Sequence, residues 1–385
     1  EAVRRAGGVY RVNIATRSGI ETVEVRGVEI LNPAVSEDAR RLAAALAEAS
    51  EIATALPSVE FYDRGEPSVA RLLAGAIEEK LRHTDLPSCV IYTAENHNHA
   101  AEILEGLCHH HRQGSGSRAG LAVQGSRRVQ FLNTVIGKMS GVVSGAGLAS
   151  LAPDLPQAFL VEEFNRILIS RITLPDFRRG ITVFVEKPDL LPFEEAKLYG
   201  HNATHALAAY LALLLEVERI ADLPNIPGAM AFLRSAFLEE SGESLIRKHA
   251  GTDYLFTPEG YREYADDLLE RMTNPWLLDK AERVGRDPAR KLGWDDRLIG
   301  TLRLALSQGV RPEKYAIGAA AALACLDASF LKENSENQIS SLLCPIWSRA
   351  DLHDEETRSV LSLIEQARLR LRRWTDTGRR DFSEM

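Results

Sequence analysis

The sequence predicts an α/β domain followed by an all-α domain, and three observations support this division. In the first half, short apolar runs rich in Val, Ile and aromatic residues alternate with segments of helical spacing, as in a mostly parallel sheet. After about Pro188 the strand-like runs stop and long helical patterns follow one another. The length of 385 residues also favours two domains. We place them at residues 1–187 and 188–385.

Several apolar runs of the first domain are expected to form strands. They are Val28–Leu31, Ile52–Leu56, Cys89–Tyr92, Val129–Val135 and Ile181–Val185. Two segments between them have the spacing of amphipathic helices: Glu37–Ala53, with Ser36 as the expected N-cap, and Ser68–Leu81. Strands that alternate with helices in this way are typical of parallel pairing.

The second domain is expected to be helical throughout. Its helical patterns cover Lys197–Ile220, Ile226–Glu239, Pro258–Met272, Asp296–Ser307 and Asp354–Trp374. Almost no strand signal separates these segments, so the sequence predicts helices that pack on one another.

Composition restricts the classes of function. Lys and Arg total 46 against 54 Asp and Glu, which gives a formal net charge of −8, so nucleic-acid binding through net positive charge is not expected. The 4 cysteines are too few and too scattered for a disulfide framework or a Cys-rich zinc site. No apolar run approaches the roughly 18 residues of a membrane-spanning helix. A soluble, cytoplasmic protein that does not bind a membrane is expected.

The strongest local signal is the sequence KLYGHNATH, which begins at Lys197 and leads into an apolar helical run. With Lys197 taken as zero and about 100° per residue, His201 lies near 40°, His205 near 80° and Asn202 near 140° around an α-helix. A lysine beside an apolar helix can have its pKa lowered, as a general base requires. An asparagine amide can donate a hydrogen bond to a developing alkoxide. The alternative is a solvated first turn that Asn202 caps.

A second polar cluster follows the predicted strand Cys89–Tyr92, where the chain reads TAENHNH from Thr93 to His99. Ligands of open α/β sheets bind beyond the carboxyl ends of the strands, which is where these residues would lie. The alternative is the start of a helix, at which Glu95 would interact favourably with the helix dipole. The sequence leaves both open.

The run His109–His111 is not expected to bind a metal ion. Consecutive helical residues point about 100° apart, so at most two of the three side chains can meet one ion, and no carboxylate stands at ligand spacing. No metal site is therefore expected.

A basic segment in the second half of the chain has two interpretations. Arg283, Arg286 and Arg290 are spaced i, i+3 and i+7, and Lys291 follows, although Pro288 is expected to interrupt any helix there. Planar guanidinium groups suit bidentate phosphate binding. A solvated face paired with neighbouring carboxylates is the alternative, and the residues alone favour it.

Taken together, these segments resemble the polyol-specific long-chain dehydrogenases. KLYGHNATH resembles the Lys-x4-Asn-x2-His signature of that family, and TAENHNHAAEIL, RMTNPWLLD, RVGRDPARKL and DDRLIG resemble further family segments in the same order. The similarity runs from about Val9 to Leu323. It implies a Rossmann-type domain that binds NAD and a helical domain that carries catalysis without a metal. The implied activity is the interconversion of a hexitol phosphate and a ketose phosphate by a monomer or small homo-oligomer.

The resemblance also implies roles for individual residues. Lys197 would be the general base, Asn96 and Asn202 would hold the alkoxide-like oxygen, and His205 would orient the polyol or polyol phosphate. The residues implied in substrate binding are Arg271, Asn274, Arg286, Arg290 and Lys291, and those implied in cofactor binding are Thr54, Leu56, Glu95 and Asn96.

Two departures from the family pattern leave alternatives open. The glycine-rich loop and the acidic residue that reads the cofactor ribose are not among these residues, so the first domain is expected to lack its first βαβ unit. Gly137 stands where relatives tend to have an Asp that would contact the polyol, so the substrate can differ. The alternatives are a dehydrogenase or reductase of an unphosphorylated polyol or a sugar acid, and a catalytically silent member that binds a ligand.

Overall fold

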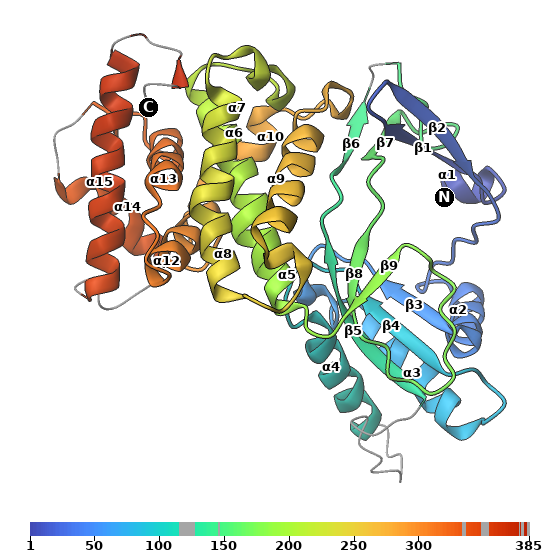
Figure 1. The fold of residues 1–385 in the computed structure, drawn as a ribbon. Coiled ribbons are helices and arrows are strands. Elements are labelled where there is room, and N and C mark those ends of the chain that lie inside the picture. The colour runs from blue at the N-terminus through green and yellow to red at the C-terminus, as the bar shows by residue number, and fades with distance from the viewer. Residues whose placement is uncertain are drawn as a thin grey trace. The chain divides into compact units, whose positions relative to one another are not determined.

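The computed structural model describes residues 1–114, 128–144, 147–332, 336–347, 354–376, 378 and 381–382. The chain divides into two compact units, one built around sheets and one helical (Figure 1). The first comprises Glu1–Ile14 and Glu21–Glu194, and the second comprises Ala15–Ile20 and Glu195–Met385. The α/β and all-α parts therefore follow the predicted order, and the compact units divide after Glu194.

The larger sheet of the first unit has the strand order β3-β4-β5-β8-β9. Its strands are β3 (Glu51–Thr54), β4 (Cys89–Thr93), β5 (Val129–Ile136), β8 (Ile167–Ser170) and β9 (Phe184–Lys187). β3, β4 and β5 are parallel, β8 is antiparallel to β5, and β9 is parallel to β8. The helices between the parallel strands are α2 (Ser36–Glu48), α3 (Val69–Arg82) and α4 (Ala100–Gly114), with a 3₁₀ turn at Val59–Phe61. This alternation confirms the α/β prediction.

Strand β4 lies between β3 and β5, and every one of its residues is buried. Cys89 and Ile91 face a core formed with α3 and α4, whereas Val90 and Tyr92 face a second core that includes Phe184. A strand covered on both faces reads as a continuous apolar run, as the sequence CVIYT does. The polar residues after Thr93 therefore leave the sheet at its carboxyl edge.

A smaller sheet was not predicted from the sequence. Its strand order is β2-β1-β7-β6, and its strands are β1 (Tyr10–Ala15), β2 (Ile20–Val25), β6 (Ser140–Ser144) and β7 (Gln157–Glu162), with the short helix α1 (Ala2–Arg5) before them. The fully buried Asn13 amide ties β1 to the chain around β7, because its Nδ2 donates to the carbonyls of Ala149 (2.8 Å) and Phe159 (3.0 Å).

Several local predictions in this unit were wrong. The helix predicted at Glu37–Ala53 ends at Glu48, and strand β3 already begins at Glu51. The strand predicted at Ile181–Val185 begins only at Phe184. Val28–Leu31 is irregular rather than a strand, because it lies between Gly27, whose φ is +73°, and Pro33, which has no N–H to donate to a ladder. Ser36 does not cap α2; it is the first residue of the helix, and Val35 precedes it without a side-chain cap. In α3, by contrast, Ser68 accepts a hydrogen bond from the Arg71 N–H as an N-cap.

The second unit consists of helices. They follow α5 (Leu191–Glu195) in the order π-helix Ala196–Asn202, α6 (Ala203–Leu214), α7 (Ala229–Ser235), π-helix Ala236–Gly242, α8 (Glu243–Lys248), α9 (Pro258–Met272), α10 (Ala281–Gly285), α11 (Pro288–Lys291), α12 (Ile299–Ser307), α13 (Glu313–Leu326), α14 (Glu336–Trp347) and α15 (Glu355–Asp376). Short 3₁₀ turns at Ile220–Asn225, Tyr254–Phe256 and Pro275–Leu277 connect some of them. None of the helices that the structure describes has the length and apolar character to cross a membrane.

Helix α13 was missed because it is not amphipathic. It packs between α6 and α15, and its residues from Tyr315 to Leu323 are all buried. A helix that is covered all round has no polar face, so the periodic pattern that identifies a surface helix is absent from its sequence. Together α6 and α13 form the apolar centre of the helical unit (Figure 1).

Candidate active site

Lys197 and Asn202 lie in a π-helix, Ala196–Asn202, and not in the α-helix assumed from the sequence. In a π-helix the backbone hydrogen bonds join residues five apart. Lys197 and Asn202 are five apart, so the π-helix brings them to one side, whereas an α-helix would separate them by about 140°. The predicted angles around an α-helix were therefore wrong for Asn202. π-helices occur frequently at functional sites.

Gly200 explains why the widened turn fits at this place. A Cβ atom on Gly200 would lie 2.6 Å from the Tyr261 hydroxyl and 2.9 Å from Phe237, closer than atoms can approach. Phe237 belongs to the second π-helix, in which Gly242 stands equally close to Tyr261. Each π-helix thus presents a glycine to Tyr261, and the Phe237 ring of the second π-helix packs against the glycine of the first.

His201 is a buried residue of the same π-helix as Lys197. Burial lowers the pKa of His201 well below its usual value, and His205 and the positive charges of Arg271, Lys197 and Arg297 lower it further. The rings of His201 and His205 have centroids 6.2 Å apart. His201 is therefore a neutral imidazole at neutral pH, surrounded by cationic side chains that come from separate elements.

His205 faces a buried carboxylate. Its Nε2 lies 3.2 Å from Asp279 Oδ2, and both atoms are buried without the alignment of a hydrogen bond. The other oxygen, Oδ1, accepts from Arg283 Nε at 2.9 Å and from a second N–H of the same guanidinium. Burial opposes ionisation of Asp279, but His205 and Arg283 outweigh it and hold the pKa of this carboxyl below its ordinary value.

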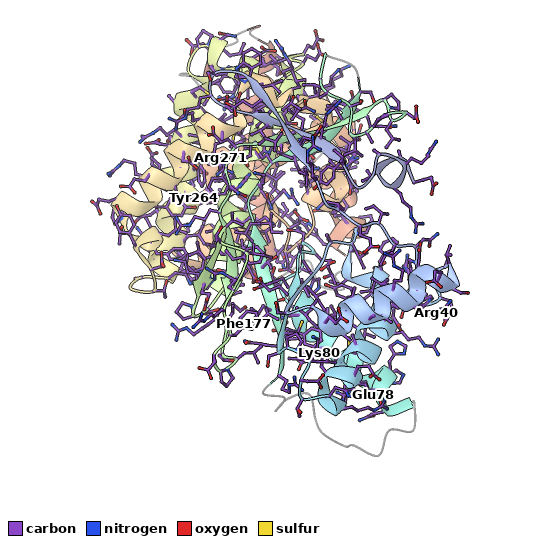
Figure 2. The ribbon with its side chains drawn as sticks, turned by 90° about the vertical axis from the view of Figure 1, so that its right-hand side faces the viewer. Arg40, Glu78, Lys80, Phe177, Tyr264 and Arg271 are labelled. Atoms are coloured by element: carbon purple, nitrogen blue, oxygen red, sulfur yellow. The ribbon has the colours of Figure 1, made fainter. Side chains whose placement is uncertain are left out.

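The two residues implied in substrate binding near the end of α9 make structural contacts. The Arg271 side chain is 13% exposed and donates to Asp267 at 3.1 Å, and Figure 2 shows it on α9, the helix that also carries Tyr264. Asn274 caps the turn Pro275–Leu277 by accepting from the Trp276 N–H, and its Nδ2 donates to the Thr16 carbonyl at 3.0 Å. Asn274 thus attaches the segment Ala15–Ile20 to the helical unit.

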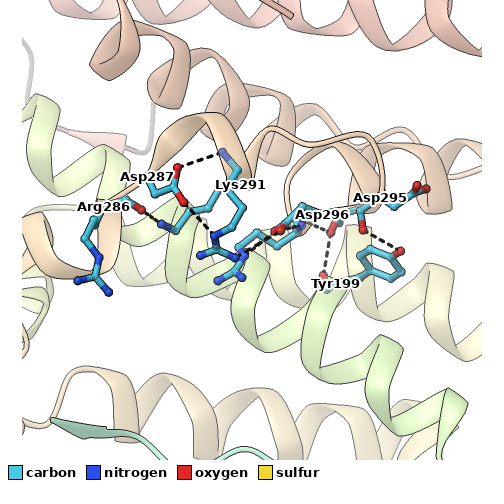
Figure 3. Close-up of polar contacts among 9 residues, drawn as sticks. Tyr199, Arg286, Asp287, Lys291, Asp295 and Asp296 are labelled. Atoms are coloured by element: carbon cyan, nitrogen blue, oxygen red, sulfur yellow. Dashed lines mark hydrogen bonds and ion pairs between the residues drawn. The ribbon is translucent and has the colours of Figure 1, made fainter. Parts of the chain in front are cut away.

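The basic segment at 286–291 does not form one cluster of converging cations. The buried Lys291 ammonium donates to the Arg286 carbonyl, and the Arg286 guanidinium points away from it (Figure 3). Burial, and then the charges of Arg297 and Arg290, lower the pKa of Lys291 to about 8. Arg290 pairs with Asp287 at 3.1 Å. Pro288 interrupts the segment as predicted, because it begins α11.

Arg297 is a site residue that the sequence analysis did not single out. Its side chain is 14% exposed, its Nε donates to Asp296 at 2.8 Å, and its charge acts on both His201 and Lys291. The turn that carries it lies against the first π-helix, because Thr301 donates to the Tyr199 carbonyl at 3.2 Å. In the sequence, Arg297 belongs to the segment DDRLIG, which resembles the family as a whole but does not distinguish Arg297 from its neighbours.

A further buried carboxylate, Glu240, connects the second π-helix to α13. It accepts hydrogen bonds from the backbone N–H groups of Lys314 (2.8 Å) and Tyr315 (3.0 Å), at the start of α13. Burial raises the pKa of Glu240 to about 7 in spite of these bonds. Tyr315 also bonds through its hydroxyl to Thr204, the residue before His205, at 2.6 Å.

In the sheet unit, Glu95 joins the predicted cofactor-binding residues at the carboxyl edge of β3 and β4. Its carboxylate accepts from the Thr54 hydroxyl and from the Leu56 N–H, both at 2.8 Å, and also from the buried Tyr62 hydroxyl. Burial and Glu95 both raise the pKa of Tyr62, so that phenol stays protonated as a donor. Thr54 and Leu56, which the family resemblance implies in cofactor binding, thus both donate hydrogen bonds to Glu95, which is 3% exposed.

Asn96 is exposed directly after Glu95. It belongs to the first compact unit, whereas Lys197, Asn202 and His205 belong to the second. Among the parts of the chain that the structure describes, no group of three His, Cys, Asp or Glu side chains is arranged to hold a metal ion.

Comparisons with known proteins agree with this combination of units. Residues 189–365 match the model of the mannitol dehydrogenase C-terminal domain. A mannitol-1-phosphate 5-dehydrogenase of Brevibacillus brevis is 28% identical over 317 residues, which is 82% of this chain and 74% of that protein. One of Bacillus licheniformis is 39% identical over 197 residues, which is 50% of this chain and 48% of that protein.

Two solved structures share the fold. A substrate-free D-sorbitol dehydrogenase superposes with a TM-score of 0.73 at 15% identity, covering 98% of this chain and 84% of its own. The ternary complex of Pseudomonas fluorescens mannitol 2-dehydrogenase with NAD and D-mannitol gives 0.64 at 16% identity, covering 98% of this chain and 82% of its own.

The fold, the Lys-x4-Asn-x2-His segment and these relatives point to one class: the chain is similar to the polyol dehydrogenase family of oxidoreductases, and its residues 189–365 match the C-terminal domain of mannitol dehydrogenases. Within that family, the relatives to which its sequence is similar over most of its length carry the name mannitol-1-phosphate 5-dehydrogenase.

Proposed function

We propose that this chain is an NAD-dependent dehydrogenase that interconverts a hexitol phosphate and a ketose phosphate, of the mannitol 1-phosphate and fructose 6-phosphate type. The observation that carries the proposal is the π-helix that brings Lys197 and Asn202 to one side and leads directly into α6, which carries His205. Relatives named for mannitol 1-phosphate support the substrate class.

The sheet unit fits a dinucleotide at the carboxyl edge of its parallel strands. Glu95 fixes the two chain segments that follow β3 and β4, and it leaves Asn96 exposed beside them. Crevices at this edge are where open α/β sheets bind nucleotides. Thr54, Leu56, Glu95 and Asn96 would shape this side of the site. NAD, when bound, supplies the acceptor for the hydride.

Lys197 acts as the general base in the direction of oxidation. It takes the proton from the substrate hydroxyl as the C–H bond of the same carbon gives up its hydride, so the carbon becomes a carbonyl. Asn202, with Asn96, donates hydrogen bonds to the oxygen while negative charge develops on it. His205 binds a further hydroxyl of the polyol and thereby orients the chain. None of these steps requires a metal ion.

Two buried arginines are better placed to attract a phosphate than the basic segment proposed from the sequence. Arg271 and Arg297 come from different elements, both are mostly buried, and the charges of both reach His201. Arg290 instead pairs with Asp287 and Asp296, and this favours the solvated salt-bridge alternative for that residue. We therefore assign the phosphate to Arg271 and Arg297.

The test is the oxidation of NADH by the full chain with fructose 6-phosphate, and in parallel with fructose, followed by NADH absorbance. Turnover with the phosphate, reduced by Arg297→Gln more than by the control Arg303→Gln, supports the proposal. Arg303 suits as a control because it carries the same group and pairs with Asp295 and Glu356 on the surface. Equal turnover with fructose would overturn the assignment of the phosphate.

One observation favours a second candidate, a dehydrogenase of an unphosphorylated polyol. Arg271 and Arg297 already have carboxylate partners, Asp267 and Asp296, which weaken their attraction for an anion. In that case fructose would be reduced, and fructose 6-phosphate would not.

A further inference from the structure

Asp279 is the buried carboxylate behind His205, and no role in catalysis follows for it from the family signature. We propose that Asp279 is a positioning residue: it holds the proton of the His205 ring on Nε2 and fixes the plane of the ring, so that Nδ1 accepts a hydrogen bond from a substrate hydroxyl. The substrate hydroxyl in this inference rests on the proposed function, whereas the contact between His205 and Asp279 does not.

The distances support an imidazole whose Nε2 carries the N–H and faces Asp279. Nε2 is the nitrogen that lies 3.2 Å from Asp279 Oδ2, and both atoms are buried, so no solvent competes for either. A neutral imidazole has one N–H and one lone pair, and a carboxylate next to one nitrogen draws the N–H to that side. Catalytic hydrogen bonds are often poorly aligned in unliganded enzymes and tighten when substrate binds.

The backbone around Asp279 is fixed from both sides. The Ile220 N–H donates to the Asp279 carbonyl at 3.0 Å, and the Ala281 N–H donates to the Glu218 carbonyl at 2.8 Å, around an antiparallel bridge between Arg219 and Lys280. These bonds place the carboxylate independently of His205, as a group that orients another side chain must be placed.

Arg283 completes the arrangement by holding the other carboxylate oxygen. Its two N–H groups donate to Oδ1, which leaves Oδ2 for the imidazole. Because His205 and Arg283 keep the carboxyl ionised, Asp279 accepts from the ring and does not donate to it. His201, the ring next to His205, experiences the charges of Lys197, Arg271 and Arg297, all of them cationic.

The first test reads the ring directly and needs no activity. With ¹⁵N-labelled histidine, the nitrogen shifts of His205, assigned by His205→Gln, should report the Nε2–H tautomer in the unmodified protein. Asp279→Asn should shift the His205 signals, whereas Asp222→Asn should not. Asp222 is a matched control because it pairs with Arg219 at 3.0 Å on the surface. An Nδ1–H tautomer in the unmodified protein would overturn the proposal even if the variant fails to fold.

The second test separates positioning from folding. Asp279→Asn should lower kcat/KM with the polyol phosphate by about 10–100-fold, as removal of a partner that orients a histidine does. If His205 binds substrate, KM should rise more than kcat falls. Unchanged kinetics in a folded Asp279→Asn variant would refute the role. If no polyol is turned over at all but the tautomer is as expected, the proposed function fails and the contact stands.

Discussion

Two buried carboxylates, Glu95 in the sheet unit and Asp279 in the helical unit, are used in different ways. Glu95 accepts from two hydroxyls and one backbone N–H, all of them uncharged. Asp279 faces an imidazole and a guanidinium. Glu95 therefore fastens two chain segments together, whereas Asp279 can alter the protonation and orientation of a neighbour.

The two carboxylates also differ in the backbone around them: the sheet unit is regular there, whereas the helical unit contains π-helices. The sheet unit keeps regular strands and places its polar contacts after their ends. The helical unit places Lys197, Asn202 and His205 within helices, and it widens a helix into a π turn to align Lys197 with Asn202. We call Glu95 the fastening carboxylate, and we call Lys197, Asn202, His205 and Asp279 the reactive cluster. Substitutions in the two groups are expected to have different effects.

The largest effect is expected at the reactive cluster. Lys197→Ala removes the proposed base and should lower turnover by about 10²–10⁴-fold, the usual contribution of general base catalysis, while the circular dichroism spectrum stays the same. Lys280→Ala is the control, because Lys280 is exposed and pairs with Glu218. Near-normal turnover of Lys197→Ala would show that Lys197 is not the base, and the helical unit would then hold no reactive cluster of this kind.

The second effect concerns Glu240, a carboxylate whose donors are uncharged, like those of Glu95, but whose pKa is raised from 4.5 to about 7. The folded state holds the proton more tightly, so this contribution to stability is complete below pH 4.5 and is lost as pH rises through 7. The free energy of unfolding should fall by about 3 kcal/mol across that range.

Urea unfolding at several pH values measures this loss. Glu240→Gln cannot ionise and should flatten the pH dependence, whereas the exposed neighbour Glu239→Gln should leave it unchanged. Parallel pH curves for the unmodified protein and Glu240→Gln would contradict the prediction.

The third effect tests the packing behind the reactive cluster. Gly200→Ala places a Cβ against Tyr261 and Phe237 and should lower the free energy of unfolding by about 1–3 kcal/mol. Gly106→Ala, in helix α4 with open space around it, should instead be neutral or stabilising by a few tenths to about 1 kcal/mol. Urea denaturation measures the free energy of unfolding of both variants. Equal changes in the two would show that the π-helix accommodates the added methyl group without loss of stability.

The smallest effect is expected at the fastening carboxylate. Glu95→Gln turns one acceptor oxygen into a donor and should cost about 1–2 kcal/mol of stability, because the Thr54 and Tyr62 hydroxyls can rotate to accept from it. The exposed Glu60→Gln is the control. A loss as large as that at Gly200 would mean that Glu95 fixes more of the sheet unit than the two segments it touches.

The sequence predicted what depends on local periodicity. Central strands such as Cys89–Thr93 and amphipathic helices such as Pro258–Met272 carry their own pattern, and both were predicted within a residue or two. Helix α13 and the smaller sheet were missed, the first because it is apolar on every side and the second because its strands pair across distant parts of the chain.

The candidate site divides in the same way. Lys197, Asn202 and His205 were named because they stand close together in one segment. Asp279 and Arg297 come from other elements, so no spacing connects them to that segment, and only the fold brings their charges to His205 and His201. The angle predicted between Lys197 and Asn202 was wrong because it assumed an α-helix. The π-helix depends on the residues that pack against it, and these cannot be identified from the local sequence.

A π turn holds one more residue than an α turn, so each π-helix carries the equivalent of one inserted amino acid. The Tyr261 side chain fills the space next to both Gly200 and Gly242, so the two insertions share this neighbour. Restoring one segment to α-helix would leave the other without its packing. Among descendants of this chain, we expect the lengths of the two segments to be inherited as a pair: both extra residues kept, or both lost.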